Sequence, residues 1–336
     1  MLAVGPIDTL HHPYYTDAMI CVLCGGTGAA KFLQGLQRVV PPAEITAIVN
    51  TGDDVVWWGL HVSPDVDSVT YAMAGILSKE RGWGIEGDTF ECHARMRELG
   101  APAWFMLGDR DLATHLQRTH WLKGGRTLTQ CTAEMARRLG VQSKILPMSD
   151  DTVETRVVTE RGELSFQEYF VRERHGPLPW EVRFIGADKA TPARGVVEAI
   201  TKAQLVIVAP SNPITSIGPI LAVAAIRKAM RATTAPIAAI SPIVKDAAVS
   251  GPAAELMRAH GLEVSVRGVA QAYADFLDLM VVDEADAKAA PRVEELGIRV
   301  HACRTMMQSE EDKAELARQV LAASKMRAKS ASQRRS

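Results

Sequence analysis

The sequence predicts an α/β fold built around a doubly wound parallel β-sheet. In the first and last thirds of the chain, short apolar runs alternate with segments of helical periodicity. The chain opens with an apolar run, a glycine-rich turn, a helix-like segment and a second apolar run. Strands that alternate with helices form parallel sheets through right-handed crossovers. The middle third lacks this alternation, so we expect a Rossmann-like sheet interrupted by a helical plus hairpin insertion.

The opening segment predicts a βαβ unit. Ile20–Cys24 is apolar and precedes glycines, which indicates a buried strand. The turn "GGTGAAK" starts a helix that runs to about Val40, and Pro41-Pro42 ends it. Residues 45–50 form the second strand. A loop and a helix over 65–77 follow, with Asp65 near the N-cap and a buried stripe of Val66, Val69, Met73 and Ile76.

The middle third predicts mainly helices and a hairpin. Helices are expected at 88–99, 111–123 and 128–139, with strands at 104–108 and 144–149. The alternating segment 153–174 surrounds the turn Arg161-Gly162, which is typical of a hairpin.

The parallel pattern then returns. Strands are expected at 182–187, 204–210, 236–244, 279–284 and 298–303, and helices at 192–203, 217–230, 253–259 and 310–323. The predicted nucleotide-binding domain therefore comprises 19–78 and 181–324, with 79–180 as an inserted capping subdomain. Residues 1–18 and the basic tail 325–336 are expected to be flexible extensions, with Met19 as an alternative natural start.

Composition excludes several classes of protein. The net charge of −1 and the pI of about 6.8 give no global field that favours nucleic acid or an anionic membrane. The uncharged stretch 203–226 contains prolines that divide it into strand, loop and helix, so it does not predict a membrane span. Five scattered cysteines indicate reduced thiols and a cytoplasmic protein. Cys21 and Cys24 should point to opposite faces of their strand and form no pair.

The turn after the first strand is a candidate phosphate site. Glycines allow a ligand to approach the backbone closely, and free amides at a helix N-terminus attract phosphate. The candidates are Gly25, Gly26, Thr27, Gly28 and, one turn later, Lys31. The sequence matches neither the dinucleotide fingerprint nor a Walker loop, so a plain tight turn with an exposed lysine remains the alternative.

Four carboxylates follow the second strand. Asp53 and Asp54 end "NTGDD", and Asp65 and Asp67 begin the next helix, near the same sheet edge. Clustered carboxylates repel one another unless a cation neutralises them, and Mg²⁺ binds few carboxylates together with phosphate oxygens. We expect Mg²⁺ ligands among Asp53, Asp54 and Asp65, with all four acids as catalytic candidates. Helix capping by Asp65 and a turn role for Asp54 are the alternatives.

Two later segments carry further polar candidates. "LGDRDLATH" places Asp109 and Arg110 at a strand-to-helix turn, where they either bind substrate or belong to a capped helix with an Asp111–His115 pair. A second segment follows a buried strand, with candidates Ser211, Asn212, Thr215, Ser216 and Gly218. Small hydroxyls and amides at a helix start favour phosphate or base recognition, with turn chemistry as the alternative.

Eight motifs in order, spanning Met19 to Ala323, closely resemble the 2-phospho-L-lactate transferase family of coenzyme F-420 biosynthesis. They are "GGTGAAKFLQGL", "VNTGDD", "SPDVDS", "RGWGIEGDTF", "LGDRDLATH", "ILPMSDD", "FQEYFVRERH" and "APSNPITSIGPI".

The resemblance implies a reaction and its partners. A guanosine diphosphate-activated hydroxyacid (phospholactate, phosphoenolpyruvate or phosphoglycerate) gives its phosphorylated part to the deazaflavin Fo, and GMP leaves. The resemblance also implies Mg²⁺, a homodimer, and contacts to Fo from Asp54 and the position of His93. Relatives often have a basic residue near that second position, so Arg95 is the substitute candidate.

A related family that resembles gluconeogenesis regulators, which bind nucleotide sugars, is the alternative function. A nicotinamide dehydrogenase is a weaker reading because the dinucleotide fingerprint is missing.

Overall fold

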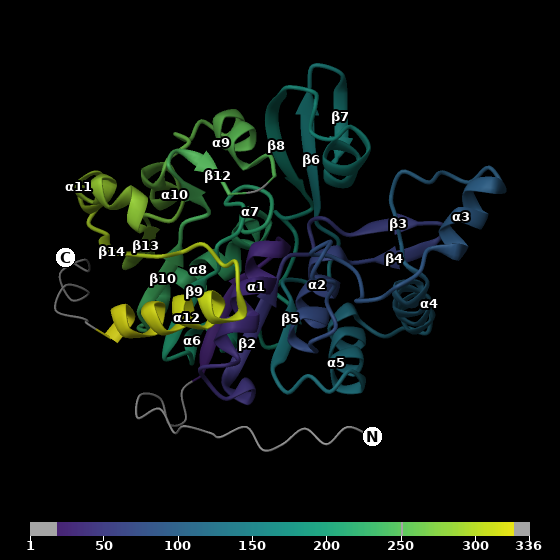
Figure 1. The fold of residues 1–336 in the computed structure, drawn as a ribbon, viewed down its shortest axis with the longest axis horizontal. Coiled ribbons are helices and arrows are strands. Elements are labelled where there is room, and N and C mark those ends of the chain that lie inside the picture. Colours follow the sequence, from purple (N-terminus) through teal and green to yellow (C-terminus); the bar gives the residue numbers. More distant parts are fainter. Residues whose placement is uncertain (1–18, 250, 326–336) are drawn as a thin grey trace.

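A seven-stranded parallel sheet forms the centre of the computed structural model, which describes residues 19–249 and 251–325 (Figure 1). Every neighbouring pair in the order β14-β13-β10-β9-β1-β2-β5 is parallel. The doubly wound parallel sheet predicted from the sequence is confirmed. Its strands are β1 (Ile20–Cys24), β2 (Ile45–Val49), β5 (Lys144–Pro147), β9 (Leu205–Val208), β10 (Ile237–Ile240), β13 (Leu279–Asp283) and β14 (Arg299–Cys303).

Helices cover both faces of this sheet, and each face has its own apolar core. One core includes side chains from α1 (Gly26–Leu36), α2 (Pro64–Met73) and α12 (Glu310–Lys325). The other core involves α6 (Val196–Thr201), α7 (Gly218–Ala222), α8 (Ala224–Ala232), α9 (Ala253–Ala259), α10 (Val266–Ala272) and α11 (Ala290–Glu294). Cys21 belongs to the second core and Cys24 to the first, and both are free thiols. The expectation that they lie on opposite faces is confirmed.

The middle of the chain adds smaller elements at one end of the sheet (Figure 1). A β3–β4 hairpin (Val55–Trp57, Leu60–Val62) occupies what the sequence presented as a loop. Trp58 and Gly59, at its turn, both have positive φ, the backbone that a tight two-residue hairpin requires. The helices here are α3 (Glu91–Glu98), α4 (Asp109–Lys123) and α5 (Leu128–Arg138).

The predicted hairpin is confirmed as β6 (Glu154–Thr159) and β7 (Gly162–Ser165), followed by a short π-helical turn, Glu168–Arg172. Segment 182–187, predicted as a strand of the parallel sheet, instead belongs to β8 (Pro179–Ile185), which pairs antiparallel with β6. A hairpin edge offers free backbone groups to the next apolar segment in the chain, which explains this local pairing.

Three other expectations change. The strand predicted at 104–108 is absent, because its aromatic side chains pack in a cluster with Trp57 and not in a strand ladder. The helix predicted at 217–230 divides into α7 and α8, with Val223 extended between them. β5 lies within the range 79–180, which was predicted to be an insertion. It nevertheless pairs with β2, so this range contributes one strand to the central sheet.

Within the ranges described, no helix has both the length and the apolar character needed to cross a bilayer. The expectations for residues 1–18 and for 326–336 of the basic tail lie outside the described residues.

Candidate active site

A cleft of about 840 Å³ lies beyond the carboxyl ends of the central strands. Its walls come from the segments that follow β1, β2, β9, β10 and β14. From β1 the chain adds strands on one side, starting with β2, and later adds strands on the other side, starting with β9. The strand order therefore reverses between β1 and β9, although all the strands are parallel. Ligands bind at such switch points in open α/β sheets.

The glycine-rich turn forms the floor of the cleft. Gly25 is the N-cap of α1, and Gly26 has φ +69°, a conformation that favours glycine. A Cβ on Gly28 would overlap the carbonyl oxygen of Pro210. Gly28 therefore lets the turn after β1 touch the turn after β9, and the first residues of α1 line the cleft.

We expect Gly28→Ala to weaken both folding and ligand binding, because the added methyl group must push two backbone segments apart. The midpoint of thermal unfolding should fall by several degrees, and the affinity for GDP, the nucleotide expected from the family resemblance, should fall at least tenfold. Differential scanning fluorimetry and calorimetric titration measure the two effects. Gly124→Ala is the matched control, since its Cβ would lie 3.3 Å from the nearest oxygen and its φ is −80°. Similar behaviour of the two variants would contradict the close approach.

Asp65 connects three parts of the floor. Its carboxylate accepts hydrogen bonds from the Gly26 amide (2.7 Å) and from Asn50 Nδ2 (2.9 Å). Asn50 in turn donates to the Thr215 carbonyl oxygen (3.2 Å) and accepts from the Gly52 amide (2.8 Å). Burial raises the pKa of Asp65 to about 6, although both hydrogen bonds oppose that shift. Asp65 is not the side-chain cap of α2, whose N-cap residue is Ser63.

Asp53 lies beside Asp65 and also lines the cleft. It is 5% exposed, and its Oδ1 has no hydrogen-bond partner among the described residues. Burial and then the nearby Asp65 carboxylate raise the pKa of Asp53 well above its ordinary value. Two buried carboxylates that repel each other, one with a free oxygen, form an arrangement that a cation would stabilise.

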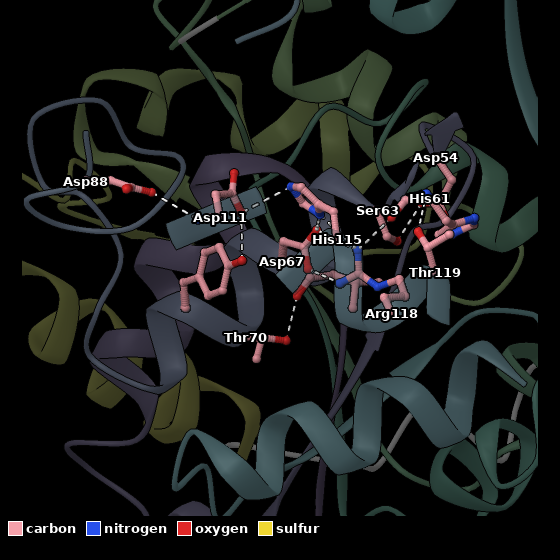
Figure 2. A network of polar contacts seen from close by, with 12 residues as sticks. Asp54, His61, Ser63, Asp67, Thr70, Asp88, Asp111, His115, Arg118 and Thr119 are labelled. Atoms are coloured by element: carbon pink, nitrogen blue, oxygen red, sulfur yellow. Dashed lines mark hydrogen bonds and ion pairs between the residues drawn. The ribbon is translucent and has the colours of Figure 1, made fainter. Parts of the chain in front are cut away.

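The other two acids have basic partners within the protein (Figure 2). Asp54 contacts His61 Nε2 (3.0 Å) and accepts from Ser63 Oγ (2.6 Å). Burial raises its pKa, with His61 as the main opposing influence. Asp67 forms a buried ion pair with Arg118, which donates to both carboxylate oxygens. The four acids therefore divide into two pairs: Asp53 and Asp65, the free pair, have no basic partner among the described residues, whereas Asp54 and Asp67 each contact a basic side chain.

The free pair fits the predicted Mg²⁺ better than a set of three aspartates does. Within 19–249 and 251–325, no group of three or more His, Cys, Asp or Glu side chains is arranged to hold a metal. Mg²⁺ characteristically uses one or two carboxylates and takes its remaining ligands from water and phosphate oxygens. Asp54, the third expected ligand, is instead bonded to His61 and Ser63.

The segment after β9 forms the opposite wall. Ser211 Oγ donates to the Gly25 carbonyl oxygen (2.6 Å), and Asn212 Oδ1 accepts from the amides of Ile214 (2.9 Å) and Thr215 (3.3 Å). Thr215 Oγ1 is buried without a hydrogen-bond partner in the part of the chain described. The residues that line the cleft here are Ser211, Asn212, Thr215 and Ser216.

The remaining expected phosphate contacts lie on α1, where Thr27 and Lys31 also line the cleft. Gly218 does not. A Cβ there would come within 2.8 Å of Phe184, so Gly218 allows α7 to pack against β8.

Asp54 and four other predicted residues also lie outside the cleft lining. Asp109 accepts from the amides of Glu91 (3.0 Å) and Cys92 (2.9 Å) and so caps α3. Arg110 donates to the Glu86 carbonyl oxygen (3.2 Å). His93 is buried beside the Trp58 ring, and exposed Arg95 pairs with Glu98 at 2.6 Å. The alternative of a capped helix with an Asp111–His115 pair matches the 3.3 Å contact between those side chains.

Sequence comparison identifies the family of the chain. A family model described as 2-phospho-L-lactate transferase CofD matches residues 20–324. The chain belongs to this family.

Its curated relatives carry two names. The 2-phospho-L-lactate transferase of Methanothermobacter thermautotrophicus is 43% identical over 307 residues, covering 91% of this chain and 98% of the relative. The phosphoenolpyruvate transferase of Kitasatospora aureofaciens is 45% identical over 311 residues, covering 90% and 97%. The chain is therefore a transferase of the CofD type, a family of coenzyme F-420 biosynthesis.

A solved structure shows the same fold. A UPF0052 family member from Bacillus halodurans superposes with a TM-score of 0.63 at 20% identity, covering 90% of this chain and 99% of that one. This likeness supports the architecture of the CofD-type transferase.

Sequence reasoning missed the apolar walls of this transferase's cleft. They are built by Trp83, Trp104, Phe105, Phe166 and Phe170. The Phe166 and Phe170 rings are stacked with centroids 5.5 Å apart. Trp83, Phe166 and Phe170 lie within quoted motifs, and Trp104 and Phe105 lie just before one, but only the tertiary fold brings these three segments to one cleft. Asn50 was also missed, although a polar residue at the end of a buried strand was an available signal.

Proposed function

We propose that this transferase moves a phosphorylated hydroxyacid from its guanosine diphosphate-activated form to the terminal ribityl hydroxyl of Fo, with release of GMP. The observation that carries the proposal is the free Asp53–Asp65 pair, in which Asp65 accepts from the Gly26 amide at the start of α1. Attack on a diphosphate requires charge neutralisation and alignment more than covalent catalysis. This floor supplies both.

Different groups of residues bind the different parts of the donor. The amides at the start of α1, with Lys31, bind the diphosphate oxygens, and the small polar groups after β9 face the guanosine part. Asp53 and Asp65 would hold Mg²⁺, which when bound supplies positive charge to the phosphate oxygens and to the leaving GMP. A neighbouring carboxylate accepts the proton of the attacking hydroxyl.

The apolar walls suit the flat ring of a deazaflavin. Trp104 and Phe170 line the cleft, and rings of this size bury large apolar areas. We further propose that the protein works in the cytoplasm as a homodimer, consistent with its five free thiols and with the family's implied assembly.

A donor comparison tests the proposed function. Purified protein is incubated with Fo, Mg²⁺ and each of the three activated donors, and the products are identified by mass spectrometry together with GMP. One donor should give a phosphodiester product and an equal amount of GMP. No product with any donor, alongside tight binding of a nucleotide sugar, would favour the regulatory alternative.

The pKa of Asp65 predicts how Mg²⁺ binding depends on pH. A carboxyl group attracts a cation only when it is ionised, and burial raises the pKa of Asp65 to about 6. The increase in unfolding temperature caused by Mg²⁺ alone should therefore be present at pH 7.5 and disappear as the pH falls through about 6. Scanning fluorimetry measures this increase, and Asp53→Asn should show little of it at any pH. An equal increase at pH 5 and pH 7.5 would contradict the assignment of Asp65.

A further inference from the structure

Residues 305–308, between β14 and α12, line one side of the cleft, and we call them the β14 wall. They have no regular secondary structure, so the shape of the wall depends on hydrogen bonds from outside it. The C-terminal end of the wall is fixed by the start of α12. Asp312 accepts from the amides of Gln308 (3.2 Å) and Ser309 (2.8 Å), and its own amide donates to Ser309 Oγ (3.1 Å). Ordinary helix capping explains these bonds.

The N-terminal end of the wall is fixed by Asp283, the last residue of β13. Its Oδ2 accepts hydrogen bonds from both the amide and the hydroxyl of Thr305, each at 3.0 Å. Its Oδ1 accepts from the Ala285 amide (3.1 Å) and so caps the short helix that follows β13. Capping therefore accounts for one oxygen of Asp283, whereas the other joins β13 to a residue 22 positions later in the chain.

Asp283 supports the cleft from behind. It is 9% exposed and is not among the residues that line the cleft, although Thr305 is. Burial alone would raise the pKa of Asp283, but the hydrogen bonds from Thr305 and Ala285 lower it below its ordinary value. Hydrogen bonds to an ionised carboxylate are stronger than those between neutral groups. Asp283 therefore fixes the β14 wall before a ligand binds, which reduces the ordering cost of binding.

The position of the β14 wall indicates which part of a ligand it meets. Three strand intervals separate β9 from β14, a distance of about 14 Å at the usual spacing of strands. In the proposed function the diphosphate lies at the glycine turn and the guanosine part passes the segment after β9, so its base extends toward the wall. Met306 and Met307 of the wall are half-buried and line the cleft. Methionine side chains pack favourably on flat aromatic rings.

We propose that Asp283 is a positioning residue for the nucleotide: through Thr305 it fixes the β14 wall against which the base of the donor packs. The inference rests on the proposed function, from which the place of the diphosphate is taken. Asp283→Asn tests it most directly, because the amide keeps the shape of the side chain. Whichever way that amide is oriented, its NH2 group faces the backbone amide of either Thr305 or Ala285.

Calorimetric titration with two probes, each in the presence of Mg²⁺, measures this role. GDP carries the base, and inorganic pyrophosphate carries the diphosphate alone. Thr305→Val is the second variant, since it removes only the bond from the hydroxyl. Asp278→Asn is the matched control. Asp278 directly precedes the same strand and accepts from the Ile237 amide (2.9 Å) at the end of the sheet away from the cleft.

We expect Asp283→Asn to weaken GDP binding at least tenfold and pyrophosphate binding less than twofold. Thr305→Val should weaken GDP binding about threefold. Asp278→Asn should bind both probes as the wild type does. In the transfer assay, Asp283→Asn should raise the KM for the donor at least tenfold, while kcat and the KM for Fo stay within twofold. A carboxylate with a merely structural role would change the binding of both probes alike.

Equal weakening of GDP and pyrophosphate by Asp283→Asn would overturn the proposal, and so would unchanged GDP binding. A rise confined to the KM for Fo would also overturn it, because the acceptor and not the nucleotide would then meet the wall. If Asp283→Asn does not fold, Thr305→Val decides by the same comparison of the two probes.

The proposed function is judged separately. A wild type that binds GDP but transfers nothing to Fo contradicts the proposed function, and the two probes still decide the role of Asp283. A wild type that transfers to Fo, with GDP binding unchanged in both variants, leaves the proposed function in place and removes Asp283 from nucleotide binding. A wild type that binds pyrophosphate but not GDP would overturn the nucleotide assignment.

Discussion

Asp53→Asn is expected to lower kcat by about 10³-fold, which corresponds to about 4 kcal/mol of lost transition-state stabilisation. The substitution keeps the shape of the side chain and removes the charge from the member of the free pair whose Oδ1 has no partner in the described chain. Without that charge, the site binds a cation weakly and leaves the phosphate oxygens uncompensated. The measurement is GMP release at saturating donor and acceptor over a series of Mg²⁺ concentrations.

High Mg²⁺ should restore part of the Asp53→Asn activity, because mass action offsets a weaker site. Asp188→Asn, an exposed aspartate outside the cleft lining, should behave as the wild type. A kcat for Asp53→Asn within threefold of the wild type at ordinary Mg²⁺ would remove Asp53 from the reaction.

Arg118→Leu is expected to lower the free energy of unfolding by about 3–5 kcal/mol. Arg118 has 3% of its side chain exposed and donates to both oxygens of Asp67. The variant leaves that aspartate buried without its counter-charge, and such a charge is much costlier than the loss of an exposed ion pair. Urea unfolding followed by circular dichroism measures the change.

The double variant Asp67→Leu with Arg118→Leu should recover a substantial part of the stability, because no unpaired charge is then buried. Arg97→Leu on α3, an exposed arginine, should change stability by less than about 0.5 kcal/mol. A loss below about 1 kcal/mol for Arg118→Leu would show that Asp67 finds another partner or water.

Local patterns were sufficient to predict the fold of the sheet. The apolar runs of β1, β2, β9 and β13 are buried along their whole length, as continuous apolar strands of a parallel sheet should be. The errors lie where local signals are ambiguous. β8 has only two buried residues, Pro179 and Val182, and joins a hairpin, and the aromatic run at 104–108 packs without a partner strand.

The glycine turn was predictable because it is contiguous and follows a strand. The division of the four acids was not, since it depends on residues far away in the chain. Asp67 forms an ion pair with Arg118, 51 positions later, and Asp54 contacts His61 on a hairpin that has no clear turn signal. Asp109 illustrates the opposite case, in which a polar residue of a striking motif caps a neighbouring helix.

The pairing of β1 with β9 has a consequence for synthesis on the ribosome. Ile20 is aligned with Leu205, and the cleft also needs the segment after β14. β1 can pair with β9 only after most of the chain has emerged from the ribosome. Contacts between residues so far apart in the sequence slow folding. During that interval the edge of β1 is unprotected, so nascent chains should depend on chaperones more than the stability of the finished enzyme suggests.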